Sequence, residues 1–249
     1  MAKGYSLHIG LNEVDPEAEQ YDGWAGKLAG PEADAHTMYN IARGLNYECS
    51  LLLLGNKATR ANFYKEVKNI QAKLQKGDLF LLTFAGHGGQ IPDKNGDEMD
   101  GLDETWCLYD AQLVDDELYG LLQTFETGIR ILIVSDSCFS GDILRKDESD
   151  GDPIFGQGRN DKIDLPNVKA SVRLLASCQE HETSKEVRGR GLFTSILEET
   201  WDEGGFEGNY HDFYDAIVSE MPFNYDQTAN HLWGGGEDTD FGDSTPFVV

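Results

Sequence analysis

Residues 79–89 read LFLLTFAGHGG, an unbroken apolar run that ends in a glycine-rich turn around His87. Residues 130–141 have the same organisation: they read RILIVSDSCFSG and end in a turn around Cys138. Continuous apolar runs of this length are typical of strands that are buried on both faces of a parallel sheet. The two stretches therefore predict buried strands that deliver an imidazole and a thiol to the same edge of the sheet.

Strand and helix patterns alternate along the rest of the chain. We predict strands at residues 6–11, 49–54, 79–85, 105–109, 130–136 and 171–177. Helical spacing covers residues 32–43, 60–75 and 116–124, with Thr59 and Asp115 as N-caps, and returns near residues 192–201 and 210–220. This alternation predicts an α/β fold, a doubly wound, mostly parallel sheet of about six strands with helices on both faces.

The length of 249 residues suits one domain with a well-buried core. Two connections, residues 86–104 and 141–170, are longer than ordinary loops. The second is polar and rich in turn residues. We interpret residues 143–170 as an acidic linker between residues 1–142 and residues 171–249 of a single domain, 1–249.

Acidic residues outnumber basic ones by 45 to 20, which gives a formal net charge of -25. Residues 191–249 contain thirteen of these acids and no Lys or Arg. Such a field repels polyphosphates and anionic lipid surfaces, and it attracts basic peptides and divalent cations. We therefore expect no nucleic-acid or membrane partner. The sequence does not indicate an oligomeric state.

Four cysteines, separated by 58, 31 and 40 residues, stand at Cys49, Cys107, Cys138 and Cys178. They form no C-x-x-C pair that would indicate zinc and no dense disulfide framework, so a reducing compartment is favoured. No apolar stretch has the length of a signal peptide core or of a membrane span of about 20 residues. We expect a soluble cytoplasmic protein.

His87 and Cys138 are the residues that favour an enzymatic function. An imidazole beside a thiol can remove its proton, and the thiolate is a nucleophile for acyl transfer. The structural alternative is a histidine that caps a turn and a cysteine that is buried and inert. A serine hydrolase elbow around Ser140 is excluded, because Cys138 stands where its first glycine belongs.

In these motifs the chain resembles the metacaspases, a group of caspase-like cysteine peptidases. The motifs are FAGHGGQ at 84–90, GDEMDGLDE at 96–104, VDDE at 114–117, SDSCFSG at 135–141, LLASCQEHETS at 174–184 and GLFT at 191–194. The resemblance covers nearly the whole chain. It implies a large-subunit-like region at residues 1–142 and a small-subunit-like region at residues 171–249.

The resemblance implies a catalytic dyad of His87 and Cys138. It also implies an oxyanion hole formed by the backbone amides of Gly88 and Cys138. His87 would then shuttle the proton as general base and general acid. No organic cofactor is implied, and the sequence does not reveal which group orients the imidazole.

Two aspartates predict a pocket for a basic side chain. Asp136 is two residues before Cys138, so in a strand both side chains leave the same face. The family resemblance adds a second acidic residue after the first strand, which here matches Asp34. We predict cleavage after Arg or Lys rather than after Asp; the alternative for Asp136 is a carboxylate that caps backbone amides. The chain departs from the family pattern nearby at Pro31, Ala33 and Ala85.

Residues 93–104 contain six acids and one lysine, which favours a bound cation or a solvated acidic loop. The loop is not an EF-hand, because Glu98 stands at the position of the turn glycine. The resemblance implies activation by calcium, bound through separated aspartates that match Asp103, Asp115 and Asp116. The fourth aspartate of the family is replaced by Arg145, and Asp142 is the nearest substitute.

Among its acids the linker also contains the basic residues Arg145, Lys146, Arg159 and Lys162. A peptidase specific for basic residues could cut its own chain after them. Exposed charges in a solvated loop are the simpler alternative.

The sequence therefore predicts a cysteine endopeptidase that acts on proteins or peptides with a basic P1 residue. One alternative is a calcium-responsive binding or scaffold module on the same fold, with an unused dyad. Another is a legumain-like or clostripain-like peptidase with a different P1 preference. The physiological substrate and pathway are not encoded in any motif.

Overall fold

A seven-stranded sheet forms the centre of the protein in a computed structural model that describes residues 1–93, 101–138, 144, 159–178, 184–222, 227–236 and 239–249. In spatial order the strands are β2 (Cys49–Leu54), β1 (Gly4–Gly10), β3 (Leu79–Ala85), β7 (Arg130–Asp136), β9 (Ser171–Ala176), β12 (Asn230–Gly235) and β8 (Asn160–Lys162). All neighbours pair in parallel except β9 and β12, which are antiparallel. The predicted doubly wound, mostly parallel sheet is confirmed, with seven strands in place of about six.

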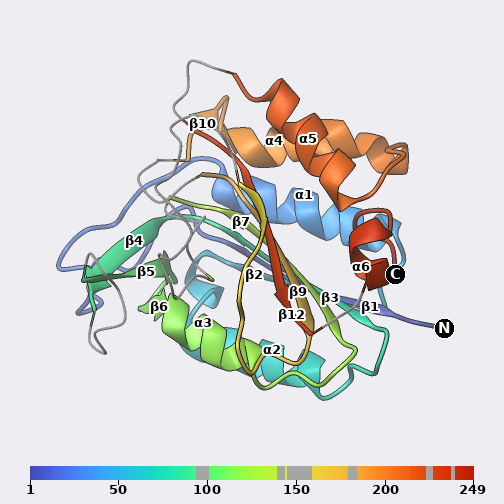
Figure 1. The fold of residues 1–249 in the computed structure, drawn as a ribbon. Helices are drawn as coiled ribbons and strands as arrows, with labels where there is room; N and C mark the ends of the chain where they lie inside the picture. The colour runs from blue at the N-terminus through green and yellow to red at the C-terminus, as the bar shows by residue number, and fades with distance from the viewer. Residues whose placement is uncertain (94–100, 139–143, 145–158, 179–183, 223–226, 237–238) are drawn as a thin grey trace.

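Helices cover both faces of this sheet (Figure 1). One face carries α1 (Pro31–Gly44), α4 (Leu192–Trp201) and α5 (Tyr210–Glu220), and the other carries α2 (Arg60–Gln71) and α3 (Asp115–Leu122). A short α6 (Thr239–Asp243) follows β12, and 3₁₀ turns occupy Gly55–Lys57 and Asp202–Gly204. None of the described helices is long and apolar enough to cross a membrane.

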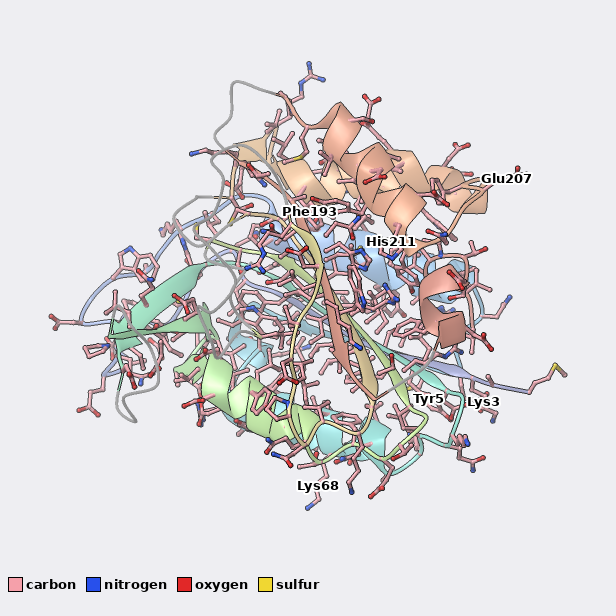
Figure 2. All side chains as sticks on the ribbon, viewed as in Figure 1. Lys3, Tyr5, Lys68, Phe193, Glu207 and His211 are labelled. Atoms are coloured by element: carbon pink, nitrogen blue, oxygen red, sulfur yellow. The ribbon has the colours of Figure 1, made fainter. Side chains whose placement is uncertain are left out.

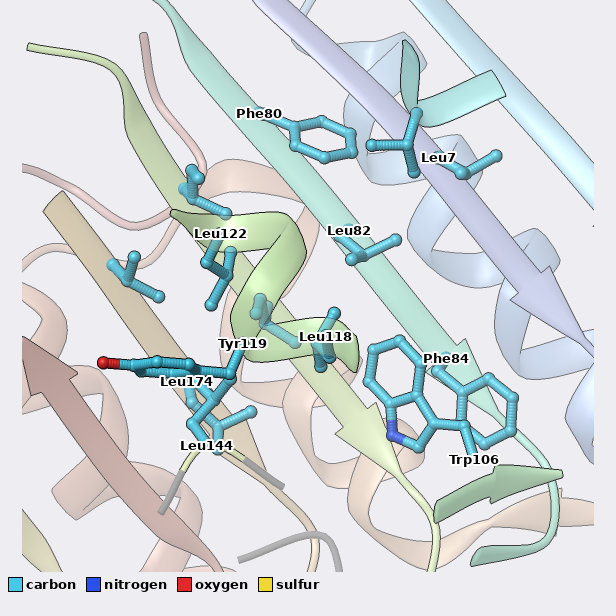
Figure 3. Close-up of a cluster of buried hydrophobic side chains, with 14 of the residues drawn as sticks. Leu7, Phe80, Leu82, Phe84, Trp106, Leu118, Tyr119, Leu122, Leu144 and Leu174 are labelled. Carbon is cyan, nitrogen blue, oxygen red and sulfur yellow. The ribbon is translucent and has the colours of Figure 1, made fainter. Parts of the chain in front are cut away.

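Alternate side chains of the central strands fill two separate cores. The core under α2 and α3 takes Phe80, Leu82, Phe84, Ile131 and Ile133. The core under α1, α4 and α5 takes Leu79, Leu81, Leu132 and Val134. Because successive residues of a strand point to opposite faces, a strand buried on both sides must be apolar throughout. Figure 3 shows the first core, and Figure 2 shows buried Phe193 within the molecule and the exposed side chains of Lys68 and Glu207.

A small antiparallel sheet leaves the central sheet directly after His87. It consists of β4 (Gly88–Pro92), β5 (Leu102–Cys107) and β6 (Gln112–Val114). The strand predicted at residues 105–109 overlaps β5 and therefore belongs to this small sheet and not to the main one, and the long connection at residues 86–104 contains β4 and the start of β5. Trp106 explains the docking of this sheet: its ring stacks on Phe84 with centroids 4.7 Å apart, and its Nε1 donates to Ser135 Oγ at 3.0 Å.

Helix boundaries agree closely with the sequence patterns. Thr59 caps α2 as predicted, because its side chain accepts a hydrogen bond from the Asn62 amide. Asp115 is not an N-cap: it is the first residue of α3, and the Glu117 carboxylate accepts from the amide of the capping residue Val114.

Besides β4 and β6, four strands were not predicted. β8 lies in the proposed linker, and β10 (Glu186–Val187) pairs with β11 (Arg190–Gly191) in a tight hairpin. Its turn residues, Arg188 and Gly189, have φ of 55° and 76°, as a two-residue hairpin turn requires. β12 was missed as well.

Replacing Trp106 with Ala should detach the small sheet from β3. A fully buried aromatic side chain contributes about 3–5 kcal/mol, so the free energy of unfolding in urea should fall by that amount. Trp24→Ala is the control: Trp24 is 46% exposed, and its replacement should cost at most about 1 kcal/mol. Equal losses for the two variants would contradict this account of how the small sheet is held.

Candidate active site

The turns that carry His87 and Cys138 meet at the carboxyl edge of the sheet. β3 and β7 are neighbours, and Ala85 pairs with Asp136. The Gly86 amide donates to the Asp136 carbonyl at 3.3 Å. On the other side of His87, a Cβ atom added to Gly88 would lie 1.9 Å from the Cys138 carbonyl oxygen. The residues on both sides of His87 therefore contact the chain at positions 136–138.

His87 is half-buried and oriented by a backbone carbonyl. Its Nε2 lies 2.9 Å from the carbonyl oxygen of Gly26, in the loop between β1 and α1. A carbonyl can only accept, so Nε2 carries the hydrogen and Nδ1 keeps the lone pair. Burial lowers the pKa of His87, although the Gly26 hydrogen bond and the charge of Glu186 oppose this effect. A neutral imidazole with one free nitrogen can act as a base.

Cys138 is a half-buried thiol. Burial raises its pKa, and the negative charge of Asp136 raises it further. Hydrogen bonds from the backbone of Ser184 and of Cys138 itself, together with the charge of Lys185, act in the opposite direction. The thiol therefore keeps its proton at neutral pH until a base removes it.

Asp34 and Asp136 lie side by side beneath Gly191. They are only 2% and 6% exposed, and a Cβ atom on Gly191 would be 2.9 Å from Asp34 Oδ2 and 2.2 Å from Asp136 Oδ2. Asp34 Oδ2 accepts from the Gly191 amide at 2.8 Å. Asp136 accepts from the amide and hydroxyl of Thr194 at 3.1 and 2.6 Å, and from the Ser184 hydroxyl. The two carboxylates thus form one buried acidic pair.

The acidic pair has an unfilled acceptor. Asp34 Oδ1 is buried and has no hydrogen-bond partner within the described part of the chain. Arg190 Nε lies 3.6 Å from it, but the Arg190 guanidinium donates to Glu198 at 2.7 Å and to Thr37 at 2.8 Å. Burial, followed by the charge of Asp136, raises the pKa of Asp34 to about 7. Burial also raises the pKa of Asp136.

A second group of buried carboxylates surrounds the start of α3. Asp103, Glu104 and Asp115 are each at most 5% exposed. Burial and the charges of Glu104, Asp116 and Asp103 raise the pKa of Asp115 to about 8, against a hydrogen bond from the Asp116 backbone. Asp115 Oδ1 is buried and lacks a hydrogen-bond partner among the described residues.

This second group has the chemistry that calcium prefers, carboxylate oxygens with an unsatisfied one among them. The described residues nevertheless contain no group of three or more His, Cys, Asp or Glu side chains arranged to hold a metal ion. Asp142, the predicted substitute ligand, lies outside the described residues.

The predicted processing positions fall into two groups. Arg145 and Lys146 lie outside the described residues. Lys162 belongs to β8, and the Arg159 carbonyl accepts from the His231 amide at 2.7 Å. The backbone at these last two positions is engaged at the sheet edge, so cleavage there requires local opening of β8.

Comparison with known proteins places this chain in a family. A family model described as the caspase domain matches residues 17–233, and the chain belongs to that family. Among individual relatives it is 25% identical to Metacaspase-1 of Saccharomyces cerevisiae over 236 residues, which cover 89% of this chain and 48% of that protein. It is 35% identical to Metacaspase-1B of Aspergillus fumigatus over 150 residues, 56% of this chain and 36% of that one. The chain spans about half the length, or less, of these curated relatives.

Two solved structures extend the comparison. Protein GSU0716 from Geobacter sulfurreducens is 40% identical, with a TM-score of 0.83 and 99% of both chains covered. Caspase-1 from Spodoptera frugiperda superposes with a TM-score of 0.56 at 12% identity, over 96% of this chain and 92% of that one. The second likeness confirms the caspase-like fold, and the resemblance to metacaspases is confirmed by the curated relatives.

Four residues of the site were not identified as functional from the sequence: Gly26, Ser184, Gly191 and Thr194. Gly26 and Gly191 act through backbone atoms, which leave no side-chain signal. Gly191 and Thr194 do lie in the GLFT motif at 191–194, and Ser184 ends the motif at 174–184. Both motifs support the family resemblance, but neither motif indicates what these residues do.

Gly88→Ala should disrupt the meeting of the two turns. The new methyl group would overlap the Cys138 carbonyl, and such overpacking costs about 1–3 kcal/mol. Thermal unfolding should show a lower midpoint. Gly120→Ala in α3 is the matched control, because a Cβ there meets nothing within 4 Å. A Gly88→Ala protein as stable as Gly120→Ala would contradict the close approach.

Asp34→Asn should change how stability depends on pH. The pKa of Asp34 is raised to about 7 in the folded state. The protonated side chain therefore stabilises the folded state fully below the ordinary aspartate pKa, and this stabilisation is lost as the pH rises through 7. Asparagine cannot ionise. The stability of the variant relative to wild type should therefore rise between pH 5 and pH 8, by on the order of 1–3 kcal/mol.

Urea unfolding at pH 5, 6.5 and 8 would measure this difference. Glu220→Gln, which removes an exposed carboxylate from α5, is the control. Parallel curves for the two variants would show that Asp34 is not titrating in a buried site.

Proposed function

We propose that this chain is a cysteine endopeptidase that cleaves proteins or peptides after Arg or Lys, with Cys138 as the nucleophile and His87 as the proton shuttle. The observation that carries the proposal is the contact between the two turns, combined with the Gly26 carbonyl that holds the His87 Nε2 hydrogen. This hydrogen bond leaves Nδ1 as the only ring nitrogen able to accept a proton. Membership of the caspase-domain family supports the same chemistry.

In the proposed reaction His87 Nδ1 takes the proton of the Cys138 thiol as sulfur attacks the scissile carbonyl carbon. The amides of Gly88 and Cys138 donate to the oxyanion of the tetrahedral intermediate. The carbon–nitrogen bond then breaks, and the imidazolium gives its proton to the departing amine. Water, deprotonated by the same imidazole, then attacks the thioester carbon, the carbon–sulfur bond breaks, and the imidazolium returns the proton to the Cys138 thiolate as the acid product leaves.

The buried acidic pair supports a basic P1 residue. Two carboxylates away from water are costly unless they are neutral or paired with a cation. Asp34 retains an unfilled oxygen and a pKa near neutrality, so a guanidinium or ammonium would pair with a carboxylate that becomes ionised on binding. Arg190 forms an ion pair with Asp34 Oδ1 at 3.6 Å but donates its hydrogen bonds to Glu198 and Thr37, so a substrate cation could still donate a hydrogen bond to this oxygen.

Fluorogenic peptides with Arg, Lys or Asp at P1 test the proposal. Wild type should cleave the Arg and Lys peptides, and Cys138→Ala should reduce kcat/KM by at least about a thousandfold. Cys49→Ala, which removes a half-buried thiol from β2, is the matched control and should keep its activity. Preferred cleavage after Asp would overturn the basic P1 assignment, and preference for another P1 residue would favour a legumain-like or clostripain-like pocket. No cleavage with any peptide would favour the binding-module alternative.

We also propose calcium activation, with Asp103, Asp115 and Asp116 as the residues that would hold the ion after their side chains are drawn together, since the described residues contain no group of three already arranged for it. Bound there, calcium would neutralise carboxylates next to the small sheet that begins at Gly88. The buried, unfilled oxygen of Asp115 supports this assignment.

Calcium should raise the unfolding midpoint of wild type in thermal shift experiments, and Asp115→Asn should reduce that shift. Glu220→Gln is the control for lost charge, because it lies on the opposite face of the sheet on α5. Equal calcium shifts in all three proteins, or none in wild type, would exclude the site.

Self-processing is proposed after Arg145 or Lys146, because the backbone next to Arg159 and Lys162 is engaged at the sheet edge. N-terminal sequencing of wild-type fragments, with Cys138→Ala as the inactive control, should reveal new termini at 146 or 147. Identical fragments from both proteins would mean that another peptidase cuts the linker.

A further inference from the structure

Trp24 is placed on the imidazole of the candidate site while much of its indole remains open to solvent. It is 46% exposed, and the other strongly exposed large apolar residues in the described part of the chain, Met1, Val248 and Val249, are at the chain ends. A single exposed apolar residue is ordinary on its own. Trp24 differs from an ordinary exposed residue because it packs against His87: the two ring centroids are 4.7 Å apart, at an interplanar angle of 57°.

The local backbone is built to hold this contact. Gly26 has φ of +49°, and a Cβ atom there would lie 2.7 Å from the indole and 2.9 Å from His87 Cδ2. The Trp24 amide donates to the Tyr21 carbonyl at 2.8 Å. Tyr21 in turn donates through its hydroxyl to the Leu108 carbonyl, next to the small sheet. The backbone of Trp24 is therefore anchored, and its indole lies against Gly26 and His87.

The chemistry of peptide cleavage determines which part of a substrate meets this indole. The imidazole must donate its proton to the departing amine, so that nitrogen has to come within hydrogen-bonding distance of His87. The departing nitrogen is the amide of the P1′ residue, and the P1′ Cα and side chain are bonded next to it. In the proposed function the P1 side chain points instead toward Asp34 and Asp136, next to Gly191. A residue packed on the imidazole therefore borders the leaving-group side.

We propose that Trp24 is a specificity-determining residue for the leaving-group side, where its exposed indole receives an aromatic P1′ side chain. This inference rests on the proposed peptidase function. Aromatic pairs gain stabilisation beyond the area that they bury, and a ring already held by its loop loses little freedom when it binds. The expected gain corresponds to a three- to tenfold preference in kcat/KM.

Internally quenched peptides that share Arg at P1 and differ only at P1′, with Phe, Leu, Gly or Asp, would measure the preference. Wild type should favour Phe over Gly, and Trp24→Ala should reduce that ratio three- to tenfold. Trp24→Phe should retain most of the ratio, which guards against misfolding of the smaller variant. Tyr64→Ala, a half-buried aromatic on α2, is the matched control and should leave the ratio unchanged.

The P1′ role of Trp24 and the peptidase function of the chain can fail separately in this experiment. If Trp24 only positions His87, Trp24→Ala will slow all four peptides by the same factor and shift the pH profile, which would overturn the specificity role. An unchanged Phe-to-Gly ratio with intact cleavage after Arg would overturn it too, while the peptidase proposal stands. If wild type cleaves none of the peptides, both proposals fail together.

Discussion

The in-register pairing of β3 with β7 is the constraint on which the candidate site depends. Because Ala85 lies opposite Asp136, the two strands end at the same level, and the turns that follow leave the sheet side by side. Gly88 allows the turns to close, since any side chain there would overlap the Cys138 carbonyl. Both strands are packed from two sides by separate cores, and a register shift of one residue would exchange their faces. The position of the reactive groups is thus set by apolar packing well away from them.

Burial of acidic groups is the second organising feature. The chain carries a formal charge of -25, which ordinary surface carboxylates could hold in water at little cost. It nevertheless buries Asp34 and Asp136 on one side of the reactive edge and Asp103, Glu104 and Asp115 near the start of α3. An ionised carboxylate without a partner is unfavourable in such places, so each group is stable as a neutral acid or in contact with a cation. The proposed binding of cations therefore rests on these positions and not on the overall charge.

Sequence reasoning succeeded where a side-chain pattern corresponds to a single structure. The apolar runs before His87 and Cys138 are stable only in the middle of a parallel sheet. Thr59 precedes a helical pattern, and its side chain caps the helix that follows. Apolar runs do not predict β12. Its residues Asn230–Gly235 include an asparagine, a histidine and glycines, and they lack the apolar run of a buried strand. Sequence reasoning also could not identify Gly26, because an accepting carbonyl exists at every residue and only the fold selects one. The small sheet was misplaced for a related reason: the apolar character of Trp106 indicates burial but not its partner.

In the proposed mechanism, the pKa shifts of His87 and Cys138 connect substrate recognition to chemistry. Burial lowers the pKa of His87 and raises that of Cys138, so the free protein favours neutral imidazole and neutral thiol over an ion pair. Part of the rise at Cys138 comes from the charge of Asp136, two residues away. In the proposed mechanism a basic P1 side chain lies beside that carboxylate and offsets its charge. Binding of the correct residue then lowers the free energy of the thiolate at the point where it must form. In the proposed mechanism Asp136 would thus contribute both to the choice of substrate and to the free energy of the thiolate.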